Sequence, residues 1–194
     1  MTIRFLEGVR VIELGSQFSS PFCSKLLADY GADVIKIENP KSGDSARRHG
    51  PFAGNVAHPE KSIPFLYLNT NKRGITLDIE STTGRQILES LLETADILVE
   101  NFRPETSHKL GLSPQMLSVR YPSLIVTSIT PFGYSGPYVN MEYTDIVICA
   151  LSGLMYHSGD SDQEPLRNVL NQSFYVAGIN AAVGTLAATF QRLT

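Results

Sequence analysis

The alternation of short apolar runs with helical segments constrains the fold of this chain most strongly. An apolar run at residues 8–14 leads into a loop of small residues and then into a helical segment that begins near Pro21. Proline suits the first turn of a helix and glycine suits its end, so Pro21 and Gly31 mark the bounds of this helix. A second apolar run follows at residues 33–38. These segments predict a strand, a helix and a second, parallel strand.

The same alternation returns after a polar segment at residues 39–62. Residues 82–93 carry apolar side chains at helical spacing, and residues 113–119 predict a shorter helix. Strands that alternate with helices predict an α/β fold, in which helices cover both faces of a mainly parallel sheet. Three further strands are predicted at residues 74–79, 96–100 and 124–129.

The last third of the chain has a different character. A loop rich in proline and glycine at residues 130–137 leads to two predicted helices at about 143–155 and 173–192. The final helix is rich in small residues, which allow close approach to a neighbour, and no glycine or proline stops it. We therefore expect residues 1–194 to be a fragment of a longer chain. We also expect both helices to expose apolar surface and to promote association.

Composition excludes several classes of protein. With a net charge of −3, the chain has no overall positive potential that would attract a polyanion, so nucleic acid is not expected as a partner. Cys23 and Cys149 lie in apolar sequence, which predicts buried thiols, and the histidines show no metal-ligand spacing. No apolar run approaches the roughly 20 residues that span a bilayer. The beginning of the chain lacks the features of a signal peptide, so we expect a protein of the cytoplasm or an organelle, without metal or membrane.

The loop between the first strand and helix bears on ligand binding. A dinucleotide fingerprint needs several glycines there, because only glycine lets a pyrophosphate approach the backbone. This loop contains only Gly15, and Phe18 occupies the space of the pyrophosphate, which disfavours a nicotinamide-dependent oxidoreductase. The start of the helix can still attract an anionic or amide-bearing ligand. Alternatively, Ser19 or Ser20 simply caps the helix.

Several blocks together resemble the class III CoA-transferase family, which includes formyl-CoA:oxalate and carnitine CoA-transferases and α-methylacyl-CoA racemases. The resemblance implies a Rossmann-like N-terminal domain within an interlocked pair of chains, each about twice as long as this one. The small domain of the family is absent from this sequence or supplied by another chain. The matching blocks are residues 8–14, 21–38, 69–78, 95–104 and 151–155, in order.

The resemblance also implies a site for coenzyme A or an acyl-CoA substrate. Asn101 is expected to bind amides of the ligand, Phe102 to pack against its adenine or pantetheine, and Lys109 to meet a phosphate. Lys72 is a further candidate, with a solvated turn as the alternative. The complete set is Ser16, Gln17, Phe18, Ser19, Lys72, Leu77, Asn101, Phe102, Thr106 and Lys109.

Two departures from the family pattern bear on phosphate binding. A basic residue is common in the family just after the second strand, where this chain has Asn39. A lysine is common at the position of Glu80. The first change removes one phosphate contact and the second introduces repulsion, so both predict weaker binding.

The most serious departure concerns catalysis. The aspartate of the family, a nucleophile in the transferases and a proton carrier in the racemases, lies four residues before a glycine that matches Gly178. That position is Phe174 here, and no acid occurs at residues 165–194. Glu164, the nearest acid upstream, lies in a polar loop typical of a solvated turn. Asp145 is kept, whereas Cys149 replaces a glutamine and, with apolar neighbours, is a poor substitute nucleophile.

Three hypotheses follow for the function. The first is an active CoA-transferase, acting on an acyl-CoA and a small carboxylic acid, whose nucleophile lies elsewhere or in a partner. The second is a non-catalytic half that forms a homodimer or a heterodimer with a family member carrying the aspartate. The third is a nicotinamide-dependent oxidoreductase, which the single-glycine loop disfavours. Phe174 favours the second hypothesis.

Overall fold

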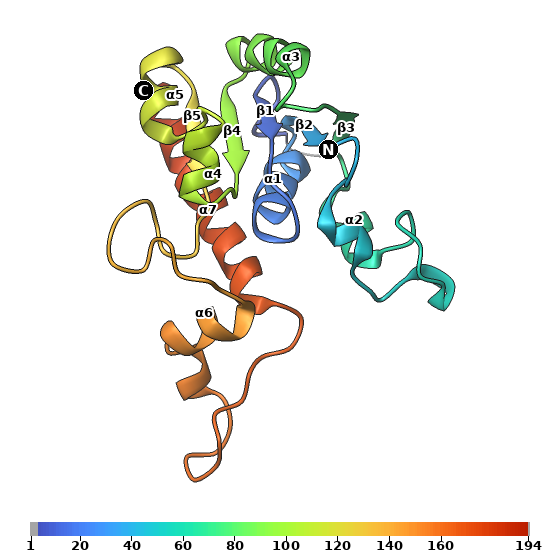
Figure 1. Cartoon of the computed structure of the whole chain (residues 1–194), viewed down its shortest axis with the longest axis vertical. Coiled ribbons are helices and arrows are strands. Elements are labelled where there is room, and N and C mark those ends of the chain that lie inside the picture. The colour runs from blue at the N-terminus through green and yellow to red at the C-terminus, as the bar shows by residue number, and fades with distance from the viewer. Residues whose placement is uncertain (1–3, 194) are drawn as a thin grey trace.

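The fold is organised around one sheet of five parallel strands. The computed structural model describes residues 4–193, and its strands lie in the order β3-β2-β1-β4-β5 (Figure 1). Every pair of neighbouring strands is parallel, so the predicted sheet is confirmed. The strands are β1 (Arg10–Glu13), β2 (Asp33–Glu38), β3 (Arg73–Thr76), β4 (Ile97–Glu100) and β5 (Ile125–Ser128).

Helices cover both faces of the sheet, which explains why its central strands are apolar at successive positions. Val11 and Ile12 of β1 are both fully buried, but they belong to different apolar clusters. The cluster around Val11 includes residues of α1 (Ser19–Asp29) and α7 (Gln172–Leu193). The cluster around Ile12 includes residues of α3 (Thr82–Glu93) and α5 (Pro114–Arg120). The expected α/β architecture is therefore confirmed.

Serine side chains begin several of the helices. Ser81 accepts a hydrogen bond from the Gly84 backbone N–H at the start of α3, and Ser113 accepts one from Met116 at the start of α5. Both helices lie within one residue of their predicted bounds. The remaining elements are α2 (Ile63–Leu68), α4 (Pro104–Lys109), α6 (Asp145–Leu151) and the 3₁₀ turns η1 (Ser45–Arg48), η2 (Ala53–Asn55) and η3 (Leu154–His157).

The start of α1 differs from the sequence prediction. The helix begins at Ser19, two residues before Pro21, and its N-cap is Phe18, whose side chain makes no capping hydrogen bond. Gln17 turns the chain with a φ of 65°, so Ser19 and Ser20 already lie inside the first helical turn. The expectation that one of these serines caps the helix is therefore wrong.

The helix predicted at residues 143–155 is interrupted. It consists of α6 (Asp145–Leu151) and the turn η3 (Leu154–His157), separated at Gly153, which has a φ of 78°. A glycine in this left-handed conformation ends a helix, since other residues adopt it only at a cost.

The long helix α7 packs closely against α1. A side chain at Gly178 would lie 2.7 Å from the backbone oxygen of Ser19, so the small residue permits this approach. By length and composition Gln172–Arg192 is long and apolar enough to cross a membrane, with a mean hydropathy of 1.3. The expectation that no apolar run reaches this length is therefore wrong. In the structure the helix lies against α1 and β5, where it covers the sheet (Figure 1).

One face of α7 remains uncovered. Val176, Ile179 and Val183 follow one another at helical spacing and are exposed, as is Ile146 of α6. The prediction that these two helices expose apolar surface is confirmed, and association through that surface stays a prediction.

Candidate functional site

The candidate site lies at the carboxyl ends of β1 and β4. These strands are neighbours, but the chain continues from β1 toward β2 on one side and from β4 toward β5 on the other. In open parallel sheets, ligands bind in the crevice at such a reversal of strand order. The loop at residues 14–18 follows β1 and residues 101–103 follow β4. Both segments therefore border this crevice.

Asn101 holds the loop that follows β1 in place through hydrogen bonds. Its Nδ2 donates to the backbone oxygen of Ser16 (2.8 Å) and to Oγ of Ser19 (3.2 Å), and its Oδ1 accepts from the Ser16 N–H (3.0 Å). A side chain at Gly15 would lie 2.0 Å from Ser20 Oγ and 2.9 Å from Asn101 Oδ1, so glycine is required there. Both amide hydrogens of Asn101 are thus engaged by the loop, and its direct contact with CoA stays a prediction.

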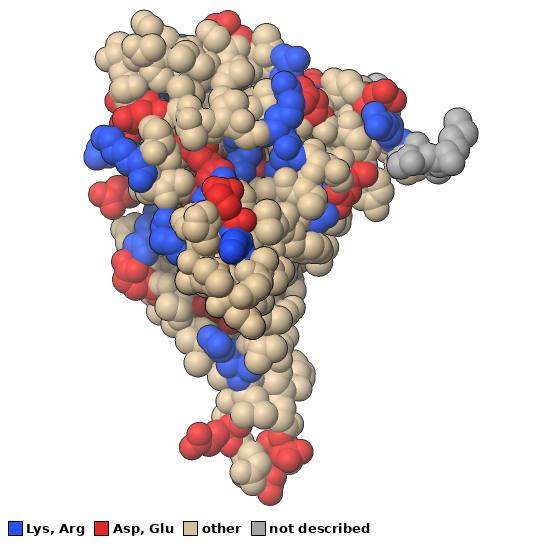
Figure 2. Space-filling view, turned by 90° about the vertical axis from the view of Figure 1, so that its right-hand side faces the viewer, with Lys and Arg blue, Asp and Glu red and all other residues tan. Residues whose placement is uncertain are grey.

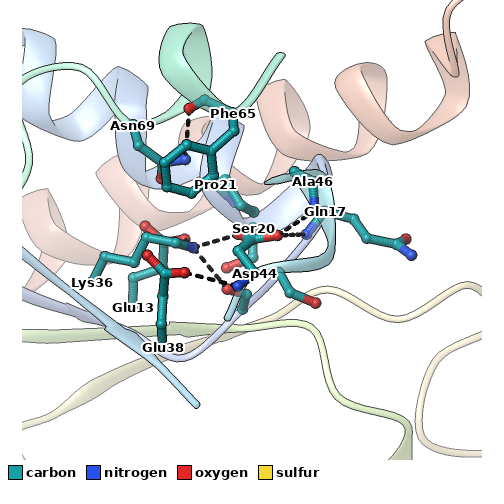
Figure 3. A network of polar contacts seen from close by, with 12 residues as sticks. Glu13, Gln17, Ser20, Pro21, Lys36, Glu38, Asp44, Ala46, Phe65 and Asn69 are labelled. Carbon is teal, nitrogen blue, oxygen red and sulfur yellow. Dashed lines mark hydrogen bonds and ion pairs between the residues drawn. The ribbon is translucent and has the colours of Figure 1, made fainter. Parts of the chain in front are cut away.

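Two acids and two lysines form a buried cluster beside the loop, and Figure 3 labels Glu13, Lys36 and Asp44 of this cluster. Glu13, the last residue of β1, pairs with Lys36 at 2.7 Å and with Lys72 at 2.8 Å, and it accepts a hydrogen bond from Ser24 at 2.5 Å. Lys36 also pairs with Asp44 at 2.7 Å and donates to the backbone oxygen of residue 15 at 3.0 Å. The two negative and two positive charges balance within the cluster.

The surroundings of each charge determine its pKa. Burial opposes the charged form of Glu13, but the charges and hydrogen bonds of Lys36 and Lys72 outweigh burial and lower its pKa to about 2. Burial likewise opposes the charge on Lys36, yet Glu13 and Asp44 together raise its pKa. Burial lowers the pKa of Lys72 to about 8, because Glu13 offsets only part of the desolvation. Glu13, Lys36 and Lys72 are therefore charged at neutral pH.

The cluster extends to the segment that follows β2 (Figure 3). Asp44 Oδ1 accepts hydrogen bonds from the backbone N–H groups of Gln17 (2.9 Å) and Ala46 (2.8 Å). Glu38 accepts from the Asp44 N–H at 2.7 Å and binds the Arg47 guanidinium through two bonds of 2.8 Å. The acid at the end of β2 therefore holds an arginine of its own chain.

An inner cavity lies on one side of the loop, next to α7. Its volume is about 90 Å³. The rings of Phe18 and Phe174 are parallel, with centroids 6.3 Å apart, and Tyr143 packs edge-on against Phe174. Phe174 thus places an apolar ring in the wall of this cavity. The predicted residues Gln17, Phe18, Ser19 and Asn101 also line it.

An outer groove lies on the other side of the loop. It has a volume of about 240 Å³ and adjoins a hollow of about 480 Å³, with which it shares Ile79, Glu80 and Leu110. Lys109 lines the hollow. The structure thus places the predicted residues other than Lys72 and Lys109 on the two sides of one loop. The predicted residues in the outer groove are Ser16, Leu77, Phe102 and Thr106.

Lys72 differs from both interpretations of the sequence. Its side chain is only 2% exposed, so it does not lie in a solvated turn. Its Nζ contacts Glu13, the backbone oxygen of Pro21 at 2.8 Å and Asn69 at 3.1 Å, and it lines neither the inner cavity nor the outer groove. The buried Glu13 carboxylate explains this position, because it draws in a second cation. The neighbouring Arg73 is exposed and pairs with Asp33.

Asp145 is an acid that lies close to Phe174 in the fold. It is buried, and its Oδ1 accepts hydrogen bonds from the Ser173 backbone N–H (3.1 Å) and hydroxyl (2.6 Å). Its Oδ2 has no hydrogen-bond partner among the described residues. Asp145 and Phe174 also line a common cavity of about 350 Å³. A carboxylate is therefore present beside the inner cavity, on α6 rather than on α7.

The other candidate groups are less suited to catalysis. Cys149 is fully buried, and burial and the nearby Asp145 raise the pKa of its thiol. Cys23 is also buried, and its pKa is raised to about 12, mainly by burial. The acidic segment with Asp160, Asp162 and Glu164 is exposed, and acidic side chains appear at one end of the molecule in Figure 2. In the described part of the chain, no group of histidine, cysteine, aspartate or glutamate is arranged to hold a metal ion.

Sequence reasoning missed the buried cluster of Glu13, Lys36, Asp44 and Lys72. A signal was present, because charged residues interrupt otherwise apolar strands at Glu13 and Lys36. Charges at the ends of buried strands need partners of opposite sign. The sequence does not say which residues these partners are.

The comparisons with known proteins identify the family. Residues 6–194 match CoA-transferase family III. The chain is 39% identical over 181 residues to a succinyl-CoA:(R)-benzylsuccinate CoA-transferase subunit, BbsE, of Thauera aromatica. This match covers 93% of the present chain and 44% of that protein. It is 36% identical to a formyl-CoA:oxalate CoA-transferase of Rhodopseudomonas palustris, in a match that covers 97% of the present chain and 43% of that protein. This chain belongs to CoA-transferase family III.

A solved structure supports the same conclusion. A CAIB/BAIF family protein from Brucella suis superposes with a TM-score of 0.88 at 32% identity, over 97% of this chain and 50% of that one. The chain therefore spans about half the length of its relatives. Its fold at the site is that of the family.

Proposed function

We propose that this chain binds acyl-CoA as the non-catalytic half of a class III CoA-transferase and takes its catalytic carboxylate from a partner of the same family. The supporting observation is Phe174, the apolar ring at the position where the family has an aspartate. A phenyl ring has no group that attacks a thioester or carries a proton. Its parallel contact with Phe18 keeps the ring in the cavity wall.

The outer groove and the inner cavity, on the two sides of the loop, fit the two ends of an acyl-CoA. The adenosine end lies in the outer groove, where Leu77 and Phe102 offer apolar contact to the base. The pantetheine arm crosses the loop at residues 15–19, and the thioester reaches the inner cavity beside Phe174. The buried ion pairs keep the loop in place before the ligand arrives, which reduces the entropy lost on binding.

A partner chain would supply the carboxylate that is absent at position 174. The relative BbsE is named as a subunit, and this chain matches less than half of its length. The exposed apolar face of α7 and α6 offers a surface for such a partner. We expect the partner to carry the aspartate.

Asp145 supports a second candidate function, an active CoA-transferase with a displaced nucleophile. Its unpartnered Oδ2 lies beside the position that the catalytic aspartate would occupy. Attack by this oxygen on an acyl-CoA would give a mixed anhydride and release CoA. Its deep burial and its two hydrogen bonds to Ser173 favour a role in joining α6 to α7 instead.

Trapping of the acyl-enzyme distinguishes the two candidates. The chain is incubated with short-chain acyl-CoA donors and hydroxylamine, digested, and searched by mass spectrometry for a hydroxamate on any carboxylate. We expect no adduct, together with saturable CoA binding in calorimetry. A hydroxamate on Asp145 that is absent from Asp145→Asn would overturn the non-catalytic proposal and support the second candidate. No binding of CoA would overturn both.

Addition of the partner provides the complementary measurement. A family member that carries the aspartate is expected to form the adduct on its own chain when the two are mixed. Phe174→Asp in this chain is not expected to restore transfer by itself, because residues 1–194 span only about half the length of the family members they match.

A further inference from the structure

The outer groove carries a charge that does not suit a phosphate. No lysine or arginine appears among the residues that line it, whereas three acids do. Two of them are neutralised within the fold, Glu38 by Arg47 and Asp44 by Lys36. Glu80 is exposed and has no ion pair within the described residues. The groove therefore presents one uncompensated carboxylate to a ligand.

The backbone of Glu80 is held by a local hydrogen bond, and its side chain is exposed. It lies in the short turn between β3 and α3, where its backbone N–H donates to Asp78 Oδ1 at 3.2 Å. It borders both the outer groove and the adjoining hollow. Lys109 lies in that hollow, and so does Arg85, whose guanidinium is already bound to the backbone oxygen of Leu110 and to Glu89. A ligand that extends from the groove into the hollow passes the residues that the two share, Ile79, Glu80 and Leu110.

A carboxylate at this place favours hydroxyl groups over phosphate. Its oxygens accept hydrogen bonds from the two neighbouring hydroxyls of a ribose, and they repel a phosphate on the same sugar. In dinucleotide sites an acid likewise selects the free ribose and an arginine selects its phosphorylated form. CoA carries a phosphate on the 3′-hydroxyl of its ribose, and dephospho-CoA carries both hydroxyls free.

We infer that Glu80 makes the outer groove select an adenosine end with free ribose hydroxyls, so that the chain binds dephospho-CoA and its thioesters more tightly than CoA and its thioesters. This inference rests on the proposed function, which places the adenosine end in the groove. Because Glu80 is exposed and partly screened, we expect a preference of about tenfold at low ionic strength.

Calorimetric titration of the 194-residue chain with CoA and with dephospho-CoA measures the preference. Glu80→Gln keeps the size of the side chain and removes its charge, and is expected to reduce the difference to about twofold. Glu80→Lys is expected to reverse it in favour of CoA. The matched control is Glu93→Gln, since Glu93 is an exposed acid at the end of α3 that lines neither the groove nor the hollow. This control is expected to keep the wild-type ratio.

The outcomes separate the inference from the proposed function. Equal affinities in the wild type, or the same ratio in Glu80→Gln, overturn the inference while leaving CoA binding intact. Failure of both ligands to bind overturns the proposed function and the inference with it. A tenfold preference that is lost in Glu80→Gln and kept in Glu93→Gln supports both.

Discussion

Glu13 and Glu100 end two neighbouring parallel strands, and both are fully buried, yet their surroundings are opposite. Glu13 lies between two lysines at 2.7 and 2.8 Å. Glu100 pairs with no lysine or arginine of the described residues. Its hydrogen bonds come from neutral groups, among them the Phe102 N–H at 2.6 Å and the Tyr134 hydroxyl at 3.0 Å, with the Ser128 hydroxyl nearby.

The difference shows that the same end of a sheet can carry one acid whose ion pairs persist and another whose charge depends on pH. Two lysines lower the pKa of Glu13 to about 2, so its ion pairs persist across the physiological range and hold the loop after β1. Burial raises the pKa of Glu100, because its hydrogen bonds compensate only part of the lost hydration. The carboxyl of Glu100 therefore responds to pH and to its hydrogen-bond donors, and through Tyr134 it contacts the loop at residues 130–138.

Glu13→Gln is expected to have the largest effect on stability. The change leaves Lys72 without an acid and Lys36 with Asp44 alone. Loss of one partner from a buried ion pair costs about 3 to 5 kcal/mol, which we expect as the loss in free energy of unfolding at pH 7, measured by urea denaturation. Glu93→Gln, at an exposed position, is the control and should change stability by less than about 0.5 kcal/mol. A loss below about 1 kcal/mol would show that the cluster does not stabilise the fold.

Acid is expected to remove the contribution of Glu13 without mutation. The folded pKa of about 2 lies below the ordinary value of 4.5, so the stabilisation is complete above pH 4.5 and is lost as pH falls toward 2. A shift of this size corresponds to about 3 kcal/mol. Urea denaturation at a series of pH values should show this decline in the wild type and a flatter curve in Glu13→Gln. Parallel curves for the two proteins would contradict the assignment.

Much of the fold could be predicted from the sequence, since apolar runs and helical spacing are local signals. The strands at 33–38 and 96–100 and the helix at 82–93 follow directly from such patterns. The start of α1 could not be predicted, because it depends on the left-handed turn at Gln17 rather than on residue preference. The end of α6 depends likewise on the conformation of Gly153.

The candidate site was predictable only in part. The loop at residues 16–19 and Asn101 meet at the strand ends, and their contact with CoA stays a prediction. The partners of Glu13 were not predictable, because Lys36 and Lys72 lie far along the chain and their approach depends on the whole sheet. Lys72 follows a turn in the sequence, which is typical of an exposed cation. In the structure it has a buried partner, Glu13, at the end of β1.

Glu100→Gln is expected to increase stability, in contrast to the same change at Glu13. An acid with a raised folded pKa contributes stability that is complete below its ordinary value of 4.5 and is lost as pH rises through the folded value. Glutamine keeps an acceptor for the Phe102 N–H and carries no charge to desolvate. We expect a gain of about 1 kcal/mol at pH 7 that disappears below pH 4.5. A loss of stability at pH 7 would show that an ionised Glu100 has a partner that outweighs its burial.

Tyr134→Phe is expected to have the smallest effect, and it tests whether Glu100 depends on neutral donors. The change removes the hydroxyl that donates to Glu100 Oε1 at 3.0 Å and keeps the ring that packs near His108. A buried acceptor that loses one donor costs about 0.5 to 1.5 kcal/mol, so we expect a modest loss of stability at pH 7. Hydrogen exchange at residues 130–138 should quicken, because the loop loses its link to β4.

Tyr138→Phe is the control, since Tyr138 lies in the same loop with an exposed side chain. In the Glu100→Gln background the effect of Tyr134→Phe should shrink, because a neutral side chain needs the donor less than a carboxylate does. Equal effects of Tyr134→Phe in the two backgrounds would show that the hydroxyl stabilises the loop independently of the charge on Glu100.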